Sequence, residues 1–281
     1  MQEDLNPWST LGSVDPRQLV EARLQLHWAV QLVSAFANAE LEHLPDDSQS
    51  NLGWQDDLDV LLGRRRPDGL AAGLSLPKLE LFVFNNAGAV VDTFPLAGRT
   101  LNQARSWLGT LTPDRDSPPV KLSDYDMPDH GVAADRPFAL EPEVAFSEIA
   151  RWYANGDSAL RALAASGPGW AEVRCWPHHF DLGTLVSLEA SSDPASGRSI
   201  GVGMSPGDAS YAEPYFYVNP YGLPSTPAAP PELPHPAHWH TEGWFGAVLT
   251  ASALLETNDP ATKLERFLNR AVAANRGLLA G

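Results

Sequence analysis

Cysteine is nearly absent from this sequence of 281 residues, which contains only Cys175. A single cysteine cannot form a disulfide within the chain, and this usage is compatible with a reducing cytoplasm. The lack of a cysteine cluster leaves no support for an iron–sulfur centre. Cys175 lies between Arg174 and Trp176 in a strand-like segment, and we expect it to be buried and inert.

Long apolar runs are missing as well. The longest nearly apolar stretch, residues 244–255, has about 12 residues, whereas a helix that crosses a bilayer needs about 20. The N-terminal sequence Met-Gln-Glu-Asp is acidic and lacks the apolar region of a signal peptide. These observations predict a soluble cytoplasmic protein.

Basic residues are scarce, with 19 Lys and Arg against 35 Asp and Glu and a net charge of −16. Because nucleic acid and anionic membranes repel an acidic protein, we expect neither as a partner. The charge fits a small-molecule ligand or a protein partner and does not indicate an oligomeric state. The basic run Arg64-Arg65-Arg66 is expected to be a solvated corner.

Common catalytic and nucleotide-binding motifs are also absent. The sequence has no Gly-rich phosphate loop and no Rossmann fingerprint, so nucleotide and NAD binding lack support. Residues 203–207, Gly-Met-Ser-Pro-Gly, fit the Gly-x-Ser-x-Gly pattern of hydrolases. That mechanism uses the backbone N–H after the serine, which Pro206 lacks, so we predict a turn instead of a nucleophile.

The apolar residues, 43% of the chain with nine Trp, are sufficient for a substantial core. Their pattern predicts an α+β fold with antiparallel sheet flanked by a long N-terminal helix, a middle helix and two C-terminal helices. His27, within the first helix, is expected to pack in the core. The predicted helices cover residues 15–43, 100–109, 143–166, 243–256 and 259–276, and 51–66 is also compatible with a helix. The predicted strands cover residues 79–84, 90–94, 171–176, 180–189, 199–204 and 214–218.

Residues 112–142 are rich in Pro and Asp and are predicted to be irregular. We expect residues 1–281 to form a single domain. Two sub-lobes, about 1–111 and 143–281, joined by this segment, are the alternative. Residues 1–14 and the loop 193–197 are also predicted to be irregular.

Residues 235–246, with the sequence His-Pro-Ala-His-Trp-His-Thr-Glu-Gly-Trp-Phe-Gly, form the most informative stretch. If residues 237–242 are extended, His238, His240 and Glu242 project from one face. Such side chains bind transition metals such as Zn, Fe, Mn or Ni, and His179 or His178 would add a further imidazole. On a strand these adjacent residues point oppositely, so only one joins, and we select His179. The His-x-His pattern resembles the first metal motif of cupin barrels over about a dozen residues, but no second motif follows residue 246.

The alternative is a metal-free cluster in which these histidines form hydrogen bonds among aromatic residues. Tyr215 and Tyr217 share one face of a predicted strand and can line a pocket. The proposed ligand-binding residues are Tyr215, Tyr217, Glu213, Trp239 and Trp244. We favour a metal-free, aromatic and His-lined small-molecule pocket or a structural role, because no motif of known chemistry remains. The second hypothesis is a metal-dependent enzyme acting on a small molecule, with Glu242 as ligand or general base.

Overall fold

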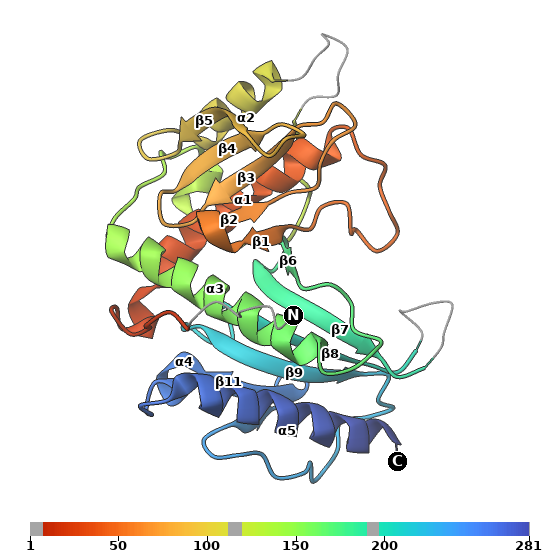
Figure 1. Ribbon diagram of the computed structural model, residues 1–281. Coiled ribbons are helices and arrows are strands. Elements are labelled where there is room, and N and C mark those ends of the chain that lie inside the picture. Colours follow the sequence, from red (N-terminus) through yellow and green to blue (C-terminus); the bar gives the residue numbers. More distant parts are fainter. Residues whose placement is uncertain (1–7, 112–119, 190–196, 281) are drawn as a thin grey trace. The chain divides into compact units, whose positions relative to one another are not determined.

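The computed structural model describes residues 8–111, 120–189 and 197–280 (Figure 1). As predicted, the described residues form an α+β fold with two antiparallel sheets and five α-helices. The irregular segments predicted at 1–14, 112–142 and 193–197 lie partly outside the described residues. No helix within the described ranges combines the length and hydrophobicity that a bilayer crossing requires.

The chain divides into two compact units. The N-terminal unit comprises Ser13–Ala154 and Arg174–Phe180, and the C-terminal unit comprises Met1–Gly12, Asn155–Val173 and Asp181–Gly281. The division falls inside helix α3 (Glu143–Ala164). It does not fall in the Pro- and Asp-rich segment.

The N-terminal unit is built on helix α1 (Val20–Asn38), which packs against a five-stranded antiparallel sheet. Asp15 caps a preceding 3-10 turn, η1 (Pro16–Gln18). Helix α1 is buried along most of its length, including His27 as expected. The strands in sheet order are β1 (Gly53–Gln55), β2 (Val60–Leu62), β3 (Ala71–Ser75), β4 (Glu80–Phe84) and β5 (Val90–Pro95).

The predicted hairpin between β4 and β5 is confirmed. Asn85 makes the turn, since its side-chain oxygen accepts hydrogen bonds from the backbone N–H groups of Ala87 and Ala89. Gly88 supplies the positive φ of 75°. Helix α2 (Leu101–Thr110) follows, with the predicted cap at Thr100 completed by the Gln103 side chain.

The helical interpretation of residues 51–66 is wrong. These residues form β1, a short 3-10 turn η2 (Asp56–Leu58) and β2. Trp54 and Leu61 are buried because they are partners across the two strands. Leu58 lies in the turn and is 53% exposed. The apolar spacing therefore reflected strand pairing and not a helical period.

Arg66 is buried, contrary to the expectation that residues 64–66 form a solvated corner. Its side chain is fully buried and lies 2.6 Å from Asp68 and 3.6 Å from Glu40. The guanidinium also stacks over the Phe36 ring, 4.2 Å from its centroid. Two carboxylates and an aromatic face compensate for the lost hydration of this charge.

Strand β6 (Arg174–Trp176) belongs to the N-terminal unit, where the backbone of Cys175 pairs with that of Leu52. Cys175 is fully buried, as expected. A third short 3-10 helix, η3 (Gly131–Ala134), interrupts the otherwise irregular part of residues 120–142 that the structure describes.

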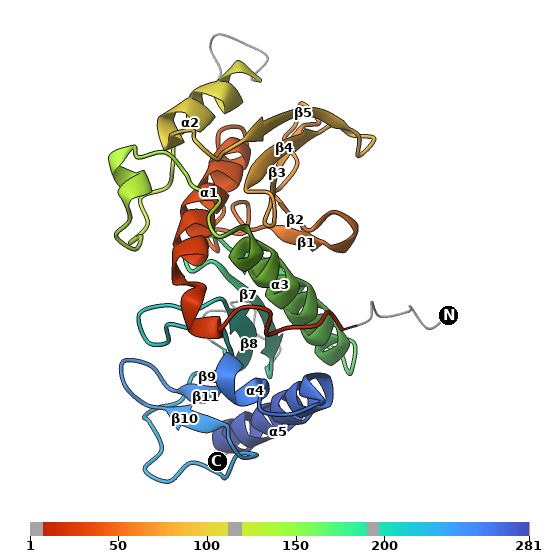
Figure 2. The ribbon, with the colours of Figure 1, turned by 90° about the vertical axis from the view of Figure 1, so that its left-hand side faces the viewer.

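The C-terminal unit contains an antiparallel sheet with helices α4 (Ala251–Leu254) and α5 (Pro260–Ala280) beside it (Figure 2). Helix α5 packs along the central strands because its apolar residues recur on one side. The strands that this unit contributes, in their order in the sheet, are β10 (His238–His240), β11 (Gly246–Thr250), β9 (Tyr215–Tyr221), β8 (Ser199–Ser205) and β7 (Asp181–Ser187).

The helix predicted over residues 243–256 is mostly wrong, because this stretch forms β11 followed by one turn of helix α4. Strand β11 pairs with β10 on one side and β9 on the other. Ala247, Val248 and Leu249 are all buried, so both faces of β11 are covered at these positions. A short continuous apolar run fits such a strand as well as a buried helix.

Candidate ligand-binding site

The strand register gathers four of the predicted site residues on one face of the sheet in the C-terminal unit. Four residues on neighbouring strands are cross-strand partners and so lie in one row across the sheet. In order, they are His238 of β10, Val248 of β11, Tyr217 of β9 and Gly203 of β8. We call this the tyrosine face, and it carries Tyr215, Tyr217, His238 and His240. The opposite face, with Leu249, is the helix face, because Leu249 lines one cavity together with Phe267 of α5.

Tyr211 is the centre of the cluster, and the sequence interpretation missed it. Its hydroxyl oxygen lies 2.9 Å from Nε2 of His238 and 2.9 Å from Nδ1 of His240. Asp208 fixes this tyrosine, because its carboxylate accepts hydrogen bonds from the backbone N–H groups of Ser210 and Tyr211. The sequence Asp-Ala-Ser-Tyr is typical of such an Asx turn and was the available indication.

The hydrogen-bond partners assign the protons in this chain of groups. Nε2 of His240 lies 2.7 Å from the carbonyl oxygen of Glu242, which can only accept, so this nitrogen carries the hydrogen. We assign the other ring nitrogen, Nδ1 of His240, as the acceptor of the Tyr211 hydroxyl. The Tyr211 oxygen in turn accepts from Nε2–H of His238. Nδ1 of neutral His238 is left as a hydrogen-bond acceptor.

Burial and charge hold the cluster in this protonation state. Partial burial, and then the neighbouring His240, lower the pKa of His238 below its usual 6.5. Burial, followed by the charges of Asp208 and Glu242, raises the pKa of the Tyr211 hydroxyl. At neutral pH His238 is therefore an uncharged acceptor and Tyr211 an intact donor. His238 is an exposed residue.

Aromatic rings surround the hydrogen-bonded chain. The His240 ring stacks on Trp244, with centroids 4.2 Å apart, and the Tyr211 ring lies 4.8 Å from Tyr215. Tyr217 meets Trp244 edge-on at 6.4 Å. A Cβ at Gly203 would lie 2.3 Å from the Tyr217 ring, so only glycine leaves room for that ring on the sheet. Trp244, Tyr211 and His240 remain partly exposed.

The hydroxyls of Tyr215 and Tyr217 are held by carboxylates. Tyr215 donates to Asp208 at 2.6 Å, and Tyr217 donates to Asp181. Burial first, and the neighbouring carboxylates second, raise the pKa values of both tyrosines. Their rings therefore contribute apolar surface, while their hydroxyls stay bound to protein groups. The sequence interpretation did not identify either aspartate.

The remaining predicted ligand-binding residues have other contacts. The carboxylate of Glu213 accepts a 2.6 Å hydrogen bond from the backbone N–H of Ser252 at the start of α4. The ring of Trp239 stacks on Phe245 with centroids 4.9 Å apart. By strand alternation, Trp239 points away from the tyrosine face that its neighbours His238 and His240 share.

The predicted metal ligands are only partly brought together. Among residues 8–111, 120–189 and 197–280, no group of three or more His, Cys, Asp or Glu side chains is placed to hold a metal ion. His238 and His240 both face the Tyr211 hydroxyl at hydrogen-bond distance. Glu242 follows the end of β10 and is exposed. His179 lies in the N-terminal unit, in the turn after β6.

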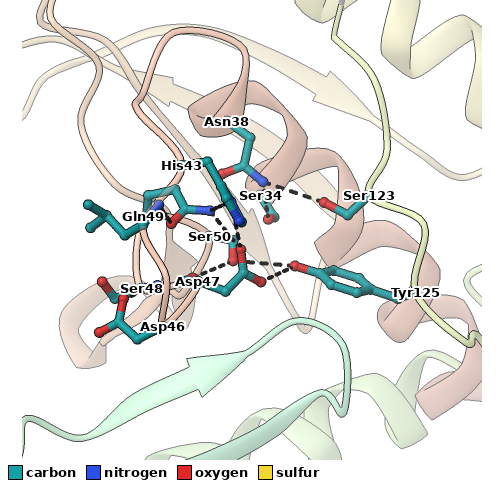
Figure 3. Close-up of polar contacts among 11 residues, drawn as sticks. Ser34, Asn38, His43, Asp46, Asp47, Ser48, Gln49, Ser50, Ser123 and Tyr125 are labelled. Atoms are coloured by element: carbon teal, nitrogen blue, oxygen red, sulfur yellow. Dashed lines mark hydrogen bonds and ion pairs between the residues drawn. The ribbon is translucent and has the colours of Figure 1, made fainter. Parts of the chain in front are cut away.

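A second polar cluster lies in the N-terminal unit around Asp47 (Figure 3). The Tyr125 hydroxyl donates to one carboxylate oxygen at 2.5 Å, and the Gln49 amide donates to the other at 2.6 Å. The Tyr125 ring packs against His178, whose centroid is 5.5 Å away. Burial lowers the pKa of His178 to about 4. This cluster ties residues 123–125 to the loop after α1, and the sequence interpretation did not identify it.

The sequence and the structure were also compared with known proteins. No protein-family model, no curated protein and no solved structure matches this chain.

Proposed function

We propose that this protein binds a small molecule on the tyrosine face, without a metal, at Tyr211, His238, His240 and Trp244. One observation carries the proposal: the Tyr211 hydroxyl joins His240 to His238, an exposed residue. With the protons assigned as above, this chain of hydrogen bonds leaves Nδ1 of His238 as an acceptor. An acceptor in this position pairs with a ligand that brings an N–H or O–H group.

The surroundings narrow the chemical class of the ligand. Asp181, Asp208 and Glu242 add negative charge on or near the cluster and disfavour an anion. The partly exposed rings of Trp244 and Tyr211 offer flat apolar surface for a ring or for the face of a cation. We therefore propose a neutral or cationic ligand with hydrogen-bond donors, such as an amine or a polyol.

Four probes with the same ring test this class. Benzylamine and benzyl alcohol carry donors, benzyltrimethylammonium carries charge without a donor, and benzoate is anionic. Two-bond proton–nitrogen NMR spectra of the imidazoles report both the tautomers and the binding. We expect the two donor probes to shift the His238 resonances and the other two to shift them much less.

Matched variants complete the experiment. His238→Phe keeps a ring but removes the acceptor, and it should abolish the binding of benzyl alcohol, measured by calorimetric titration because the His238 resonances are lost with the residue. Tyr221→Phe, at an exposed tyrosine at the end of β9, is the control and should leave this binding intact. Equal affinities of His238→Phe and the unmodified protein for benzyl alcohol would refute this role for the imidazole.

A metal-dependent enzyme at His238, His240 and Glu242 is the second candidate. The observation that favours it is the convergence of two imidazoles on one point, the Tyr211 oxygen. Elemental mass spectrometry of protein purified without an affinity tag distinguishes the two proposals. If the protein contains about one equivalent of Zn, Fe, Mn or Ni and His240→Ala loses it, the metal-free proposal is wrong and the metal-dependent one is supported.

A further inference from the structure

A cavity of about 360 Å³ lies on the helix face of the C-terminal unit. Leu249 of β11 and Phe267 of α5 form part of its wall, together with the prolines at 234 and 236 before β10. Val248, the neighbour of Leu249, lies in register with His238. Because side chains alternate along a strand, this cavity is separate from the tyrosine face. Its volume falls within the range of small-molecule sites, about 300–1,000 Å³.

Two cations line the cavity from one side of α5. Lys263 and Arg266 are one helical turn apart and so project in similar directions. The Lys263 ammonium donates to the carbonyl oxygen of Ala253, which leaves two of its hydrogens for another partner. Within the described part of the chain, the guanidinium of Arg266 has no hydrogen-bond or ion-pair partner. This is notable in a protein with 35 acidic and 19 basic residues.

The carboxylate in the lining, that of Asp259, already has a hydrogen-bond partner. Asp259 caps α5, and its carboxylate accepts a 3.1 Å hydrogen bond from the backbone N–H of Thr262. That interaction lowers the pKa of Asp259. With Lys263 and Arg266 opposed by this single carboxylate, the lining keeps a surplus of one positive charge. The cavity is thus locally cationic in a strongly acidic protein.

We infer that this cavity binds a small organic carboxylate with an apolar body. The planar guanidinium of Arg266 matches a carboxylate through two parallel hydrogen bonds, and the Lys263 ammonium adds a second charge. The Leu249 and Phe267 side chains and the two prolines provide apolar surface for the rest of the ligand. This site is independent of the proposed function, since the tyrosine face disfavours anions.

Benzoate is the probe for this inference, with benzyl alcohol and benzylamine as controls of the same shape. Calorimetric titration at low ionic strength should give saturable benzoate binding. Arg266→Gln should raise the Kd about tenfold, as expected for the loss of a charged, two-point contact. Arg270→Gln is the matched control, because Arg270 is exposed on the same helix and is not part of the lining. It removes the same charge and should change the Kd less than about twofold.

A second variant tests the cavity itself. Thr262→Trp places a large side chain at an exposed lining position without removing a charge, and it should abolish benzoate binding. The inference is wrong if benzoate does not bind, if Arg266→Gln weakens benzylamine binding as much as benzoate binding, or if Arg266→Gln and Arg270→Gln have the same effect on benzoate. Benzoate binding that persists in Thr262→Trp would also overturn it.

Discussion

His27 should make the stability of this protein depend on pH. His27 is only 8% exposed, and its ring stacks on that of Phe180 with centroids 5.5 Å apart. Nε2 lies 3.0 Å from the carbonyl oxygen of Pro177. Burial lowers the pKa of His27 from 6.5 to about 4, because the charged imidazolium would lose its hydration.

The sign follows from the order of the two pKa values. The unfolded chain takes up a proton near 6.5, whereas the folded protein takes it up only near 4. The contribution of His27 to stability is therefore complete above pH 6.5 and is lost progressively as the pH falls toward 4. A pKa shift of this size corresponds to about 3 kcal/mol in the free energy of unfolding. About 2 kcal/mol of this should be lost between pH 7.5 and pH 5.

Urea unfolding of the full chain and of His27→Phe across this pH range measures the effect. Phenylalanine keeps the stacked ring but does not titrate, and Gln31 still donates to the Pro177 carbonyl at 2.6 Å. The difference in the free energy of unfolding between the two proteins should be constant above about pH 7 and change by about 2 kcal/mol on acidification.

The direction of that change is the decisive result. The full chain should lose stability relative to His27→Phe as the pH falls. His43→Gln, at an exposed residue, is the control and should parallel the full chain. A difference that stays flat from pH 7.5 to pH 5, within about 0.5 kcal/mol, would show that His27 is not desolvated as described.

Other contacts lead to four further predictions. Arg66→Ala should lower the free energy of unfolding by about 3 kcal/mol, measured by urea unfolding, because it leaves two carboxylates without their buried partner. Gly203→Ala should cost about 1–3 kcal/mol because its methyl group meets a tyrosine ring, whereas Gly277→Ala, with open space around it, should be neutral or stabilising. Tyr211→Phe should redistribute the tautomers of His238 in imidazole NMR spectra while the fold, followed by circular dichroism, is retained. Binding of benzyl alcohol should weaken as the pH falls through the lowered pKa of His238, because protonation removes the acceptor.

The sequence predicted those parts of the fold that depend on local patterns. The Asn85–Gly88 turn, the Thr100 cap and helices α3 and α5 are encoded by residues close together in the chain. The shared face of His238 and His240 also followed from strand alternation alone, and their common contact with Tyr211 agrees with it. Burial of His27 was likewise predictable from its place on the helix.

The remaining parts depend on pairing between distant segments. Residues 51–66 and 243–256 contain apolar runs that fit a helix or a strand, and only their partner strands decide between the two. Tyr211 reaches His240 across 29 positions of sequence, which no local pattern indicates. Burial of Arg66 requires that Asp68, Glu40 and Phe36 meet around it, although it follows two other arginines in the sequence.

The tyrosine ring over Gly203 has a consequence for how this sequence can diverge. The ring of Tyr217 and the backbone oxygen of Leu182 together fill the space of the missing side chain. Gly203→Ala should be costly beside Tyr217 and should stay costly in a Tyr217→Ser background, because the added Cβ would still lie 2.4 Å from the Leu182 oxygen. A double-mutant cycle between the two positions would measure the part of the cost that the ring alone causes. In related chains position 203 should therefore remain glycine even where position 217 and the other site residues differ.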